Sequence, residues 1–299
     1  MILLEPKIEK MVRKARNLFQ QKNFEDAIKI YQAAEKKLEP DSNQLHLIQI
    51  EMGWCFYSAG KYENAVICLQ NALSYPGLIL QQQFNCLRLI GFSLAAQNLT
   101  QEALPYLQKA IQLPLSDFDK RFTIYQLGKL FFLRGEWQKA KPLVEKAFRQ
   151  FNAAETEYLN TCRYYLGFIA YFEKNDAEAE NHFRALIHPD LDAKTRATGY
   201  FGLTHILYEK RQFSVLIDTC EKIVALQPEF YDKETLAFFL CRSYMELKMW
   251  NELENFFNRL KDVYPQGRYA ISYPFFEEAI SRREIPESLK KAANTLYPS

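Results

Sequence analysis

The sequence is short of glycine, with 10 among 299 residues, about 3% against the roughly 7% of ordinary proteins. Tight hairpin turns and phosphate-binding loops both depend on glycine, so this shortage argues against all-β sandwiches and nucleotide-binding α/β folds. The motifs GxxxxGK[ST], GxGxxG, GxSxG and HExxH are absent as well. We therefore expect a protein that is not an enzyme and binds no cofactor.

Metal-binding patterns are also missing. The six cysteines include no C-x-x-C pair, and His182 and His188, six residues apart, have no set of cysteine or acidic residues at metal-ligand spacing. The cysteines lie within apolar stretches, where free cysteine behaves as a small buried hydrophobe. We expect six buried free thiols and no metal site.

The chain lacks a strong charge of either sign and lacks long apolar runs. It has 38 Lys and Arg against 36 Asp and Glu, a net charge of +2, which gives no overall attraction to nucleic acid or to a membrane surface. No run approaches the 18 apolar residues of a membrane-spanning helix, and the apolar residues 1–4 are too few for a signal peptide. These features predict a cytoplasmic protein without membrane insertion. Aromatic residues, at 15%, are what the chain has in excess.

A repeated spacing of small residues runs through most of the chain. The first five repeats have a small residue such as Gly53 and an alanine twelve positions later, such as Ala65, and the last two have leucine at this second position. In the repeats with the clearest pattern an aromatic residue precedes this second position by three, as at Tyr62 and Trp137. The pattern resembles the tetratricopeptide repeat (TPR), a helix-turn-helix unit of about 34 residues. The anchor residues of the seven repeats are Ala27, Ala65, Ala103, Ala140, Ala179, Leu216 and Leu253.

The spacing of the anchors is 37 to 39 residues, which exceeds 34 by about one helical turn. We expect longer helices or longer loops between repeats. A proline follows the second helix of most repeats, where it prevents the helix from continuing. The fourth repeat lacks this proline and has the segment 151–155 in its place, which predicts a bend or a longer loop near 150–158.

The resemblance implies an all-α solenoid, a right-handed TPR superhelix over residues 1–266. In each repeat the small residue of the first helix (helix A) would let the anchor alanine of the second helix (helix B) approach closely. Residues 267–299 keep an apolar periodicity with a charged face, which predicts a helical cap. We expect one cap helix with Ser272 as its N-cap and another that begins at Pro286.

The resemblance also implies that helix A of each repeat lines a concave groove. Positions two and three before the small residue, and one and four after it, face this groove. Many of them are aromatic with arginine between them, the composition of an interaction hot spot. The predicted partner-binding residues are Arg16, Trp54, Tyr57, Arg88, Phe92, Tyr125, Lys129, Phe132, Tyr164, Tyr165, Phe168, Tyr171, Phe201, His205, Tyr208, Phe238 and Arg242. The same rule places Phe19, Ile50 and Glu51 on this side.

This surface favours a non-catalytic scaffold or adaptor that binds an extended or helical segment of another protein. Arg16, Arg88, Lys129 and Arg242 would orient acidic groups of that partner. An alternative is a regulatory TPR domain that senses a small peptide, because some bacterial regulators use repeats longer than 34 residues. A third, weaker alternative is RNA binding by stacked aromatic side chains, which the near-zero net charge argues against.

Some TPR proteins hold the carboxyl-terminal end of chaperones with a set of Lys, Asn and Arg side chains. This set is absent, because the matching positions hold Val12 and Arg16, Glu51, Asn85 and Leu89. The sequence leaves open the identity of the partner and the oligomeric state. It also leaves open whether the groove is accessible or filled by the chain's own C-terminal helices.

Overall fold

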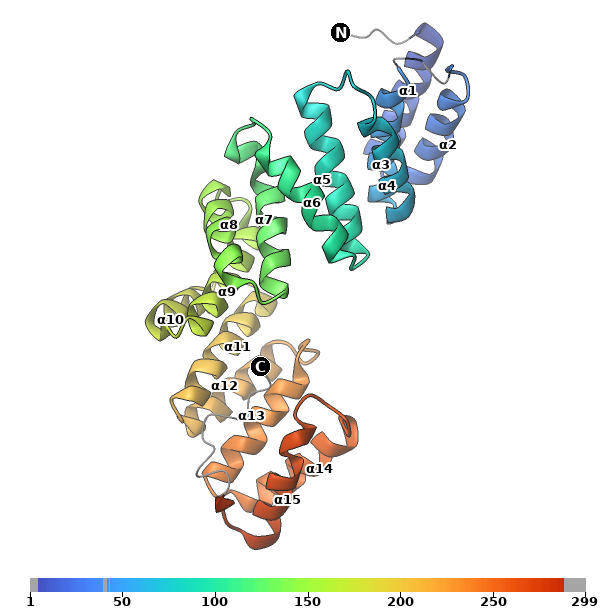
Figure 1. The fold of residues 1–299 in the computed structure, drawn as a ribbon. Coiled ribbons are helices and arrows are strands. Elements are labelled where there is room, and N and C mark those ends of the chain that lie inside the picture. Colours follow the sequence, from blue (N-terminus) through green and yellow to red (C-terminus); the bar gives the residue numbers. More distant parts are fainter. Residues whose placement is uncertain (1–4, 40–41, 43, 288–299) are drawn as a thin grey trace. The chain divides into compact units, whose positions relative to one another are not determined.

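Every regular element among residues 5–39, 42 and 44–287, the part that the computed structural model describes, is a helix (Figure 1). The chain forms two compact units, Met1–Glu155 (unit 1) and Thr156–Ser299 (unit 2). Unit 1 contains α1 (Pro6–Gln20), α2 (Phe24–Glu35), α3 (Leu45–Ser58), α4 (Tyr62–Leu73), α5 (Leu80–Ala96), α6 (Thr100–Gln112), α7 (Asp117–Leu133) and α8 (Trp137–Gln150). Unit 2 contains α9 (Thr156–Phe172), α10 (Asp176–Ala185), α11 (Ala193–Glu209), α12 (Phe213–Leu226), α13 (Lys233–Glu246), α14 (Trp250–Val263), the 3₁₀ helix η1 (Ala270–Ser272) and α15 (Tyr273–Arg282).

The helices from α1 to α14 pair into seven hairpins that coincide with the seven predicted repeats. Each even-numbered helix begins three residues before an anchor, for example α2 at Phe24 and α8 at Trp137. All seven anchors are fully buried. The all-α solenoid fold is therefore confirmed.

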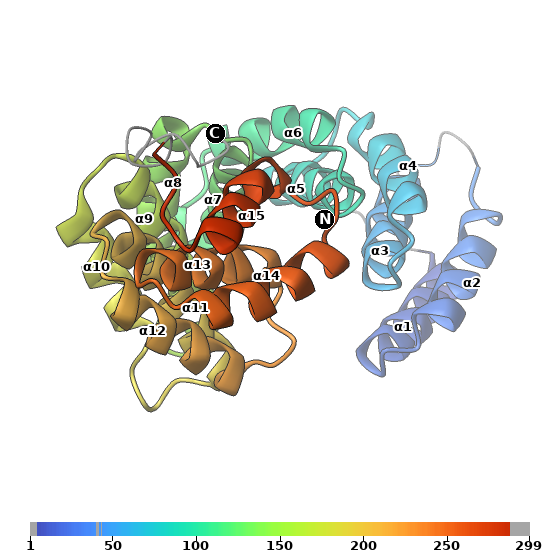
Figure 2. The same cartoon turned by 90° about the horizontal axis from the view of Figure 1, so that it is seen from below.

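Packing within each unit follows the order of the chain, as in other solenoids. In unit 1 each helix packs on the next one, and α5 also contacts α3 and α7, the first helices of the neighbouring repeats. Both views show α1 beside α2 and α3 beside α4 (Figures 1 and 2). The first helices of successive repeats therefore share one side of unit 1.

Helix crossing within a repeat depends on the glycine of helix A, whose nearest contact is a larger side chain than the expected anchor alanine. A Cβ atom at Gly53 would lie 2.6 Å from Cγ of Leu69, and one at Gly91 would lie 2.4 Å from Cδ2 of Leu107. Leu69 and Leu107 each lie one turn after an anchor alanine. The glycine therefore makes room mainly for the larger side chain that follows the anchor, and at Gly91 also for the backbone oxygen of the anchor Ala103, 3.4 Å from the added Cβ.

The turn between helices A and B has the same backbone feature in all seven repeats. The residue five positions before the anchor has a positive φ, a left-handed conformation that glycine adopts most easily. Glycine occupies this position only at Gly60 (φ 74°) and Gly135 (φ 73°). The other repeats place Lys22, Asn98, Lys174, Arg211 and Lys248 there. The sequence pattern did not reveal this feature, because five of the seven residues are not glycine.

The division between the compact units falls between Glu155 and Thr156. The prediction of a longer loop near 150–158 was wrong, because only residues 151–155 separate α8 from α9, whereas residues 186–192 separate α10 from α11. Within unit 1 the segment after α8 is fixed to α7. Nε and Nη2 of Arg121 donate to Oε1 of Glu155 at 3.0 and 2.9 Å, and the ring centroids of Phe122 and Phe151 lie 5.4 Å apart. Side-chain contacts therefore replace the missing proline in ending this repeat.

The helix predicted at the start of the C-terminal region is present as α15, which packs on α13 and α14. Ser272 precedes it but makes no side-chain cap, since its hydroxyl is buried and bonds to none of the described residues. Ser272 is therefore the N-cap residue by position, as predicted, but its side chain does not make the capping hydrogen bond. The helix expected from Pro286 lies mostly outside the described residues, and the boundary between repeats and cap at 266/267 stays a prediction.

Candidate functional site

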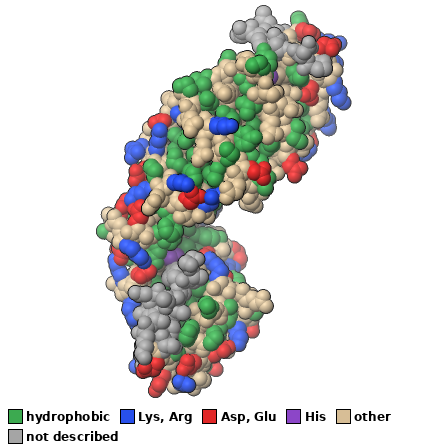
Figure 3. Space-filling view, viewed as in Figure 1, with side chains coloured by type: hydrophobic (Ala, Val, Ile, Leu, Met, Phe, Trp, Pro, Cys, Tyr) green, Lys and Arg blue, Asp and Glu red, His purple; other side chains and the backbone are tan. Residues whose placement is uncertain are grey.

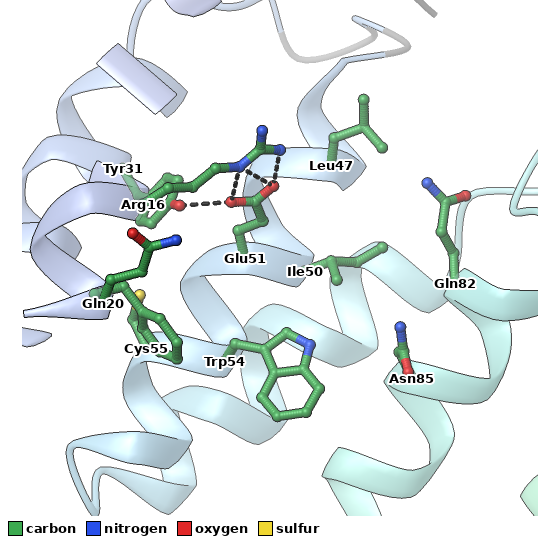
Figure 4. A pocket seen from close by; sticks show the side chains of 11 residues that line it. Arg16, Gln20, Tyr31, Leu47, Ile50, Glu51, Trp54, Cys55, Gln82 and Asn85 are labelled. Carbon is green, nitrogen blue, oxygen red and sulfur yellow. Dashed lines mark hydrogen bonds and ion pairs between the residues drawn. The ribbon is translucent and has the colours of Figure 1, made fainter. Parts of the chain in front are cut away.

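Unit 1 contains a pocket of about 700 Å³ on the side formed by the first helices of its repeats. Side chains of α3 such as Ile50 and Trp54 face Gln82 and Asn85 of α5 across its opening (Figure 4). Arg16 and Gln20 of α1 line the pocket at the end away from α5 (Figure 4). The lining residues are Arg16, Phe19, Gln20, Tyr31, Leu47, Ile50, Glu51, Trp54, Cys55, Gln82 and Asn85.

An ion pair forms one wall of this pocket. Nε of Arg16 donates to both carboxylate oxygens of Glu51, at 3.0 and 2.9 Å, and the hydroxyl of Tyr31 donates to Oε2 at 2.6 Å. The hydrogen bond with Glu51 raises the pKa of Arg16, while burial and the neighbouring Glu51 raise the pKa of Tyr31. Arg16 is thus charged and already neutralised by a partner from the same unit.

The opposite wall is polar without being charged. Oε1 of Gln82 accepts from the backbone N–H of Ile79 at 3.1 Å, and Oδ1 of Asn85 accepts from Nε2 of Gln81 at 3.4 Å. The side-chain NH₂ groups of Gln82 and Asn85 donate to none of the described residues. Such amide groups present the hydrogen-bonding pattern that a peptide backbone also presents.

Arg88 lies beside the pocket and is partly buried. Its guanidinium carbon is 5.0 Å from the ring centroid of Trp54 and 5.3 Å from that of Phe84. Both distances are within the range of cation–π attraction. Burial lowers the pKa of Arg88, and no ion pair with a described residue offsets this.

The thiol of Cys55 also lines the pocket, and burial raises its pKa to about 12. At neutral pH it is protonated and unreactive. All six cysteines are free, as predicted, and five are buried, whereas Cys68 is only partly so. No group of three or more His, Cys, Asp or Glu side chains that would hold a metal ion occurs in the described part of the chain.

The remaining predicted residues of unit 1 are half-buried on the same first helices. The ring centroids of Tyr57 and Phe92 lie 6.5 Å apart, and those of Tyr125 and Phe151 lie 6.0 Å apart. Lys129 and Phe132 also keep part of their surface accessible, and Lys129 forms no ion pair with any described residue. Hydrophobic side chains gather over unit 1 on the face shown in Figure 3, with charged side chains mainly along its edges.

The predicted residues of unit 2 have different surroundings. Tyr164 and Tyr208 are half-buried, whereas the other seven are buried. Phe168 lies at the centre of an aromatic cluster, with its ring centroid 5.0 Å from Phe183 and 5.1 Å from His205. The buried residues are Tyr165, Phe168, Tyr171, Phe201, His205, Phe238 and Arg242.

Other aromatic residues of unit 2 pack onto this cluster. The ring of Phe230 lies 5.1 Å from that of Phe201, Tyr269 stacks on Phe238 at 4.2 Å, and the hydroxyls of Tyr231 and Tyr164 are 2.6 Å apart. Phe230 and Tyr231 lie between α12 and α13, and Tyr269 directly precedes η1. Residues of the chain itself therefore cover much of the aromatic stripe in the described part of unit 2, while Tyr171 also lines a pocket of about 290 Å³ with Lys174, Asp176, Glu209 and Lys210.

Arg242 is neutralised within unit 2. Its Nη2 donates to Oε1 of Glu246 at 2.5 Å, and Arg211 donates to Oε2 of the same carboxylate at 2.7 Å. Nη1 of Arg242 is buried and bonds to no described residue. The contact of Arg242 with a partner stays a prediction, as it does for the other residues of the predicted groove.

Six residues of the pocket were not predicted: Gln20, Tyr31, Leu47, Cys55, Gln82 and Asn85. A signal for three of them exists in the sequence. Asn85 and Gln82 lie six and nine positions before Gly91, and Leu47 lies six positions before Gly53. Residues three apart lie on the same face of a helix, so these positions continue the face that begins three residues before the glycine. The groove prediction considered no position earlier than three residues before the small residue of helix A, and so it missed Leu47, Gln82 and Asn85.

Comparison with known proteins supports the fold. No protein-family model matches the chain. Response regulator aspartate phosphatase A of Bacillus subtilis is 27% identical over 175 residues, which cover 56% of this chain and 46% of that protein. The chain therefore matches less than half the length of this relative.

Two solved structures extend the similarity over most of the chain. The apo form of the quorum sensor NprR from B. thuringiensis has a TM-score of 0.68 at 12% identity, covering 97% of this chain and 86% of that one. A tetratricopeptide repeat protein from Parabacteroides merdae has a TM-score of 0.58 at 15% identity, covering 93% and 99%. The fold is that of TPR proteins. Within the residues described, no helix is both long and apolar enough to cross a membrane.

Proposed function

We propose that this protein is a non-catalytic regulatory scaffold and that the pocket of unit 1 binds a peptide segment of a partner. The observation that carries the proposal is the pocket itself. It offers about 700 Å³ between an aromatic floor at Trp54 and the amide side chains of Gln82 and Asn85. Ligand sites combine an apolar cavity with a few polar groups in this way.

The partner segment enters in an extended form, because the pocket is open along the side shared by α1, α3 and α5. Its apolar side chains contact Trp54 and Ile50, and its backbone bonds to the two amide side chains. Tyr57, Phe92, Tyr125, Lys129 and Phe132 continue the same surface. The residues of the buried cluster in unit 2 contact a partner only where their aromatic packing opens.

A second candidate is a regulator that senses a free small peptide. The resemblance of nearly the whole chain to a quorum sensor favours it, and so does the name of the sequence relative, a regulatory phosphatase. Both candidates use the same pocket and differ in whether the peptide is free or part of a protein. In either case we place the protein in the cytoplasm.

The test uses Trp54 as its own reporter. The double substitution Trp137→Phe and Trp250→Phe leaves Trp54 as the only indole of the chain. Titration with pools of synthetic hexapeptides should then change the fluorescence of Trp54 in a saturable way. The absence of a saturable change with every pool would contradict the proposal.

Asn85→Ala in the same background provides the matched test of the pocket. Loss of one hydrogen bond to a peptide backbone should weaken binding roughly 2- to 10-fold. Asn71→Ala on the exposed surface of α4 is the control and should leave binding unchanged. If Asn85→Ala and Asn71→Ala changed the affinity for the peptide equally, the peptide would not bind at Asn85.

A further inference from the structure

Two arginines near the pocket of unit 1, Arg16 and Arg88, differ in whether an acidic side chain of the described residues pairs with them. Arg16 has Glu51 as its partner, and this pair is complete within the pocket. Arg88 has no carboxylate partner among the described residues. Of these two arginines, Arg16 forms an ion pair and Arg88 forms none with the residues that the structure describes.

The surroundings of Arg88 make this charge costly. The side chain is half-buried between Trp54 and Phe84, and its Nε is enclosed without any described acceptor. The two Nη groups also donate to none of the described residues. Enclosing Nε without an acceptor costs the free protein stability, and an anion that accepts from the guanidinium offsets part of the cost of burying this charge.

The position of Arg88 connects it to the pocket. It lies one helical turn after Asn85 on α5, and its guanidinium faces the ring of Trp54. Asn85 and Trp54 both line the pocket. A peptide that contacts these two residues therefore brings one of its groups next to Arg88.

We propose that Arg88 is a carboxylate-binding residue and that the pocket of unit 1 selects peptides with an anionic group at this point. This inference rests on the proposed function and adds the chemistry of the ligand to it. The planar guanidinium donates two parallel N–H bonds from its Nη groups to the carboxylate. The aromatic rings of Trp54 and Phe84 hold the guanidinium in place, so little side-chain entropy is lost on binding.

The carboxylate has two possible sources, the C-terminus of the peptide and an Asp or Glu side chain. The experiment therefore uses hexapeptide pools in four matched forms, with a free acid or an amide at the C-terminus and with Glu or Gln at the variable positions. Binding is measured by Trp54 fluorescence in the single-tryptophan background. The protein variants are Arg88→Met, Arg88→Lys and, as a matched control on the exposed surface of α8, Arg149→Met.

We expect the protein with Arg88 to bind one carboxylate form roughly 10- to 100-fold more tightly than the neutral form. This preference should disappear in Arg88→Met, persist in weaker form in Arg88→Lys and remain intact in Arg149→Met. It should also weaken as ionic strength rises, because salt screens the interaction. The form that shows the preference identifies the source of the carboxylate.

Thermal unfolding separates recognition from a structural role. Methionine replaces a half-buried charge with an apolar side chain of similar length, so Arg88→Met should keep or raise the melting temperature. Equal binding of all four peptide forms, or an unchanged preference in Arg88→Met, would overturn the inference and leave the proposed function standing. If none of the four peptide forms binds, both the inference and the proposed function are overturned.

Discussion

At the scale of single residues, the turn position five before each anchor has the clearest consequence for stability. Lys248 occupies it with a φ of 58°, in which its Cβ atom strains the backbone, and its side chain is exposed. Lys248→Gly should stabilise the protein by about 0.5–1 kcal/mol, because glycine adopts this conformation without strain. Urea denaturation followed by circular dichroism measures the difference.

Lys248→Ala is the control for this prediction. Alanine removes the same lysine side chain but keeps the Cβ atom that causes the strain, so it should give little or no gain. An equal gain from both substitutions would show that the lysine side chain, and not the backbone conformation, was the source of strain.

A second consequence at this scale concerns pH. Burial lowers the pKa of His205 to about 4, below its ordinary value of 6.5. Between these values the unfolded chain binds a proton that the folded chain does not, so the free energy of unfolding decreases as the pH falls from 6.5 to 4. The expected loss from this residue is on the order of 3 kcal/mol.

The comparison of the parent protein with His205→Phe isolates this contribution from that of the carboxylates. The variant should lose less stability between pH 6.5 and pH 4.5 than the parent, as measured by urea denaturation at each pH. Parallel pH profiles of the two proteins would show that His205 does not titrate in this way.

At the scale of helices, the crossing of A and B within a repeat limits what can replace its glycine. A Cβ atom at Gly91 would overlap the side chain of Leu107. Gly91→Ala should therefore destabilise the protein by about 1–3 kcal/mol, the usual cost of overpacking a core.

A double-mutant cycle tests this explanation. Leu107→Ala alone should destabilise the protein by about 2–5 kcal/mol through the cavity it creates. The cost of Gly91→Ala should be much smaller in the Leu107→Ala background, since the overlapping atoms are gone. Additive costs would show that the glycine serves another purpose.

The helices are also where prediction from sequence succeeded best. The repeated spacing of small residues fixes which residues form each hairpin, because the same packing problem recurs every 37 to 39 residues. The sequence pattern provided no expectation for contacts between repeats. Gly202, for example, makes room for Phe183 of the preceding repeat, a contact that no single repeat reveals.

The candidate site was less predictable than the fold for a related reason. A periodic aromatic stripe looks the same in the sequence whether it lines an open surface or a packed interior. Trp54 and Phe168 occupy the same position relative to the glycine of their repeats, yet Trp54 borders a pocket and Phe168 is buried. The difference arises from side chains such as Phe201 and Phe183, which fill the space around Phe168.

At the scale of the whole molecule, the two compact units present the same repeat in two ways. Unit 1 keeps an accessible pocket beside Arg88, which forms no ion pair with any described residue, whereas unit 2 pairs Arg242 with Glu246 and buries most of its aromatic stripe. From this contrast we propose different roles for the two units. Unit 1 recognises the peptide, and the packed cluster of unit 2 contributes stability.

The most direct test of this account is to map where a bound peptide lies. Hexapeptide pools that carry the photoreactive residue benzoylphenylalanine are bound to the full chain and irradiated, and the adducts are located by mass spectrometry. The account predicts adducts within residues 16–20, 47–55 and 82–85, which line the pocket. Adducts concentrated in residues 164–171, 201–208 or 238–242 would contradict it and assign recognition to unit 2.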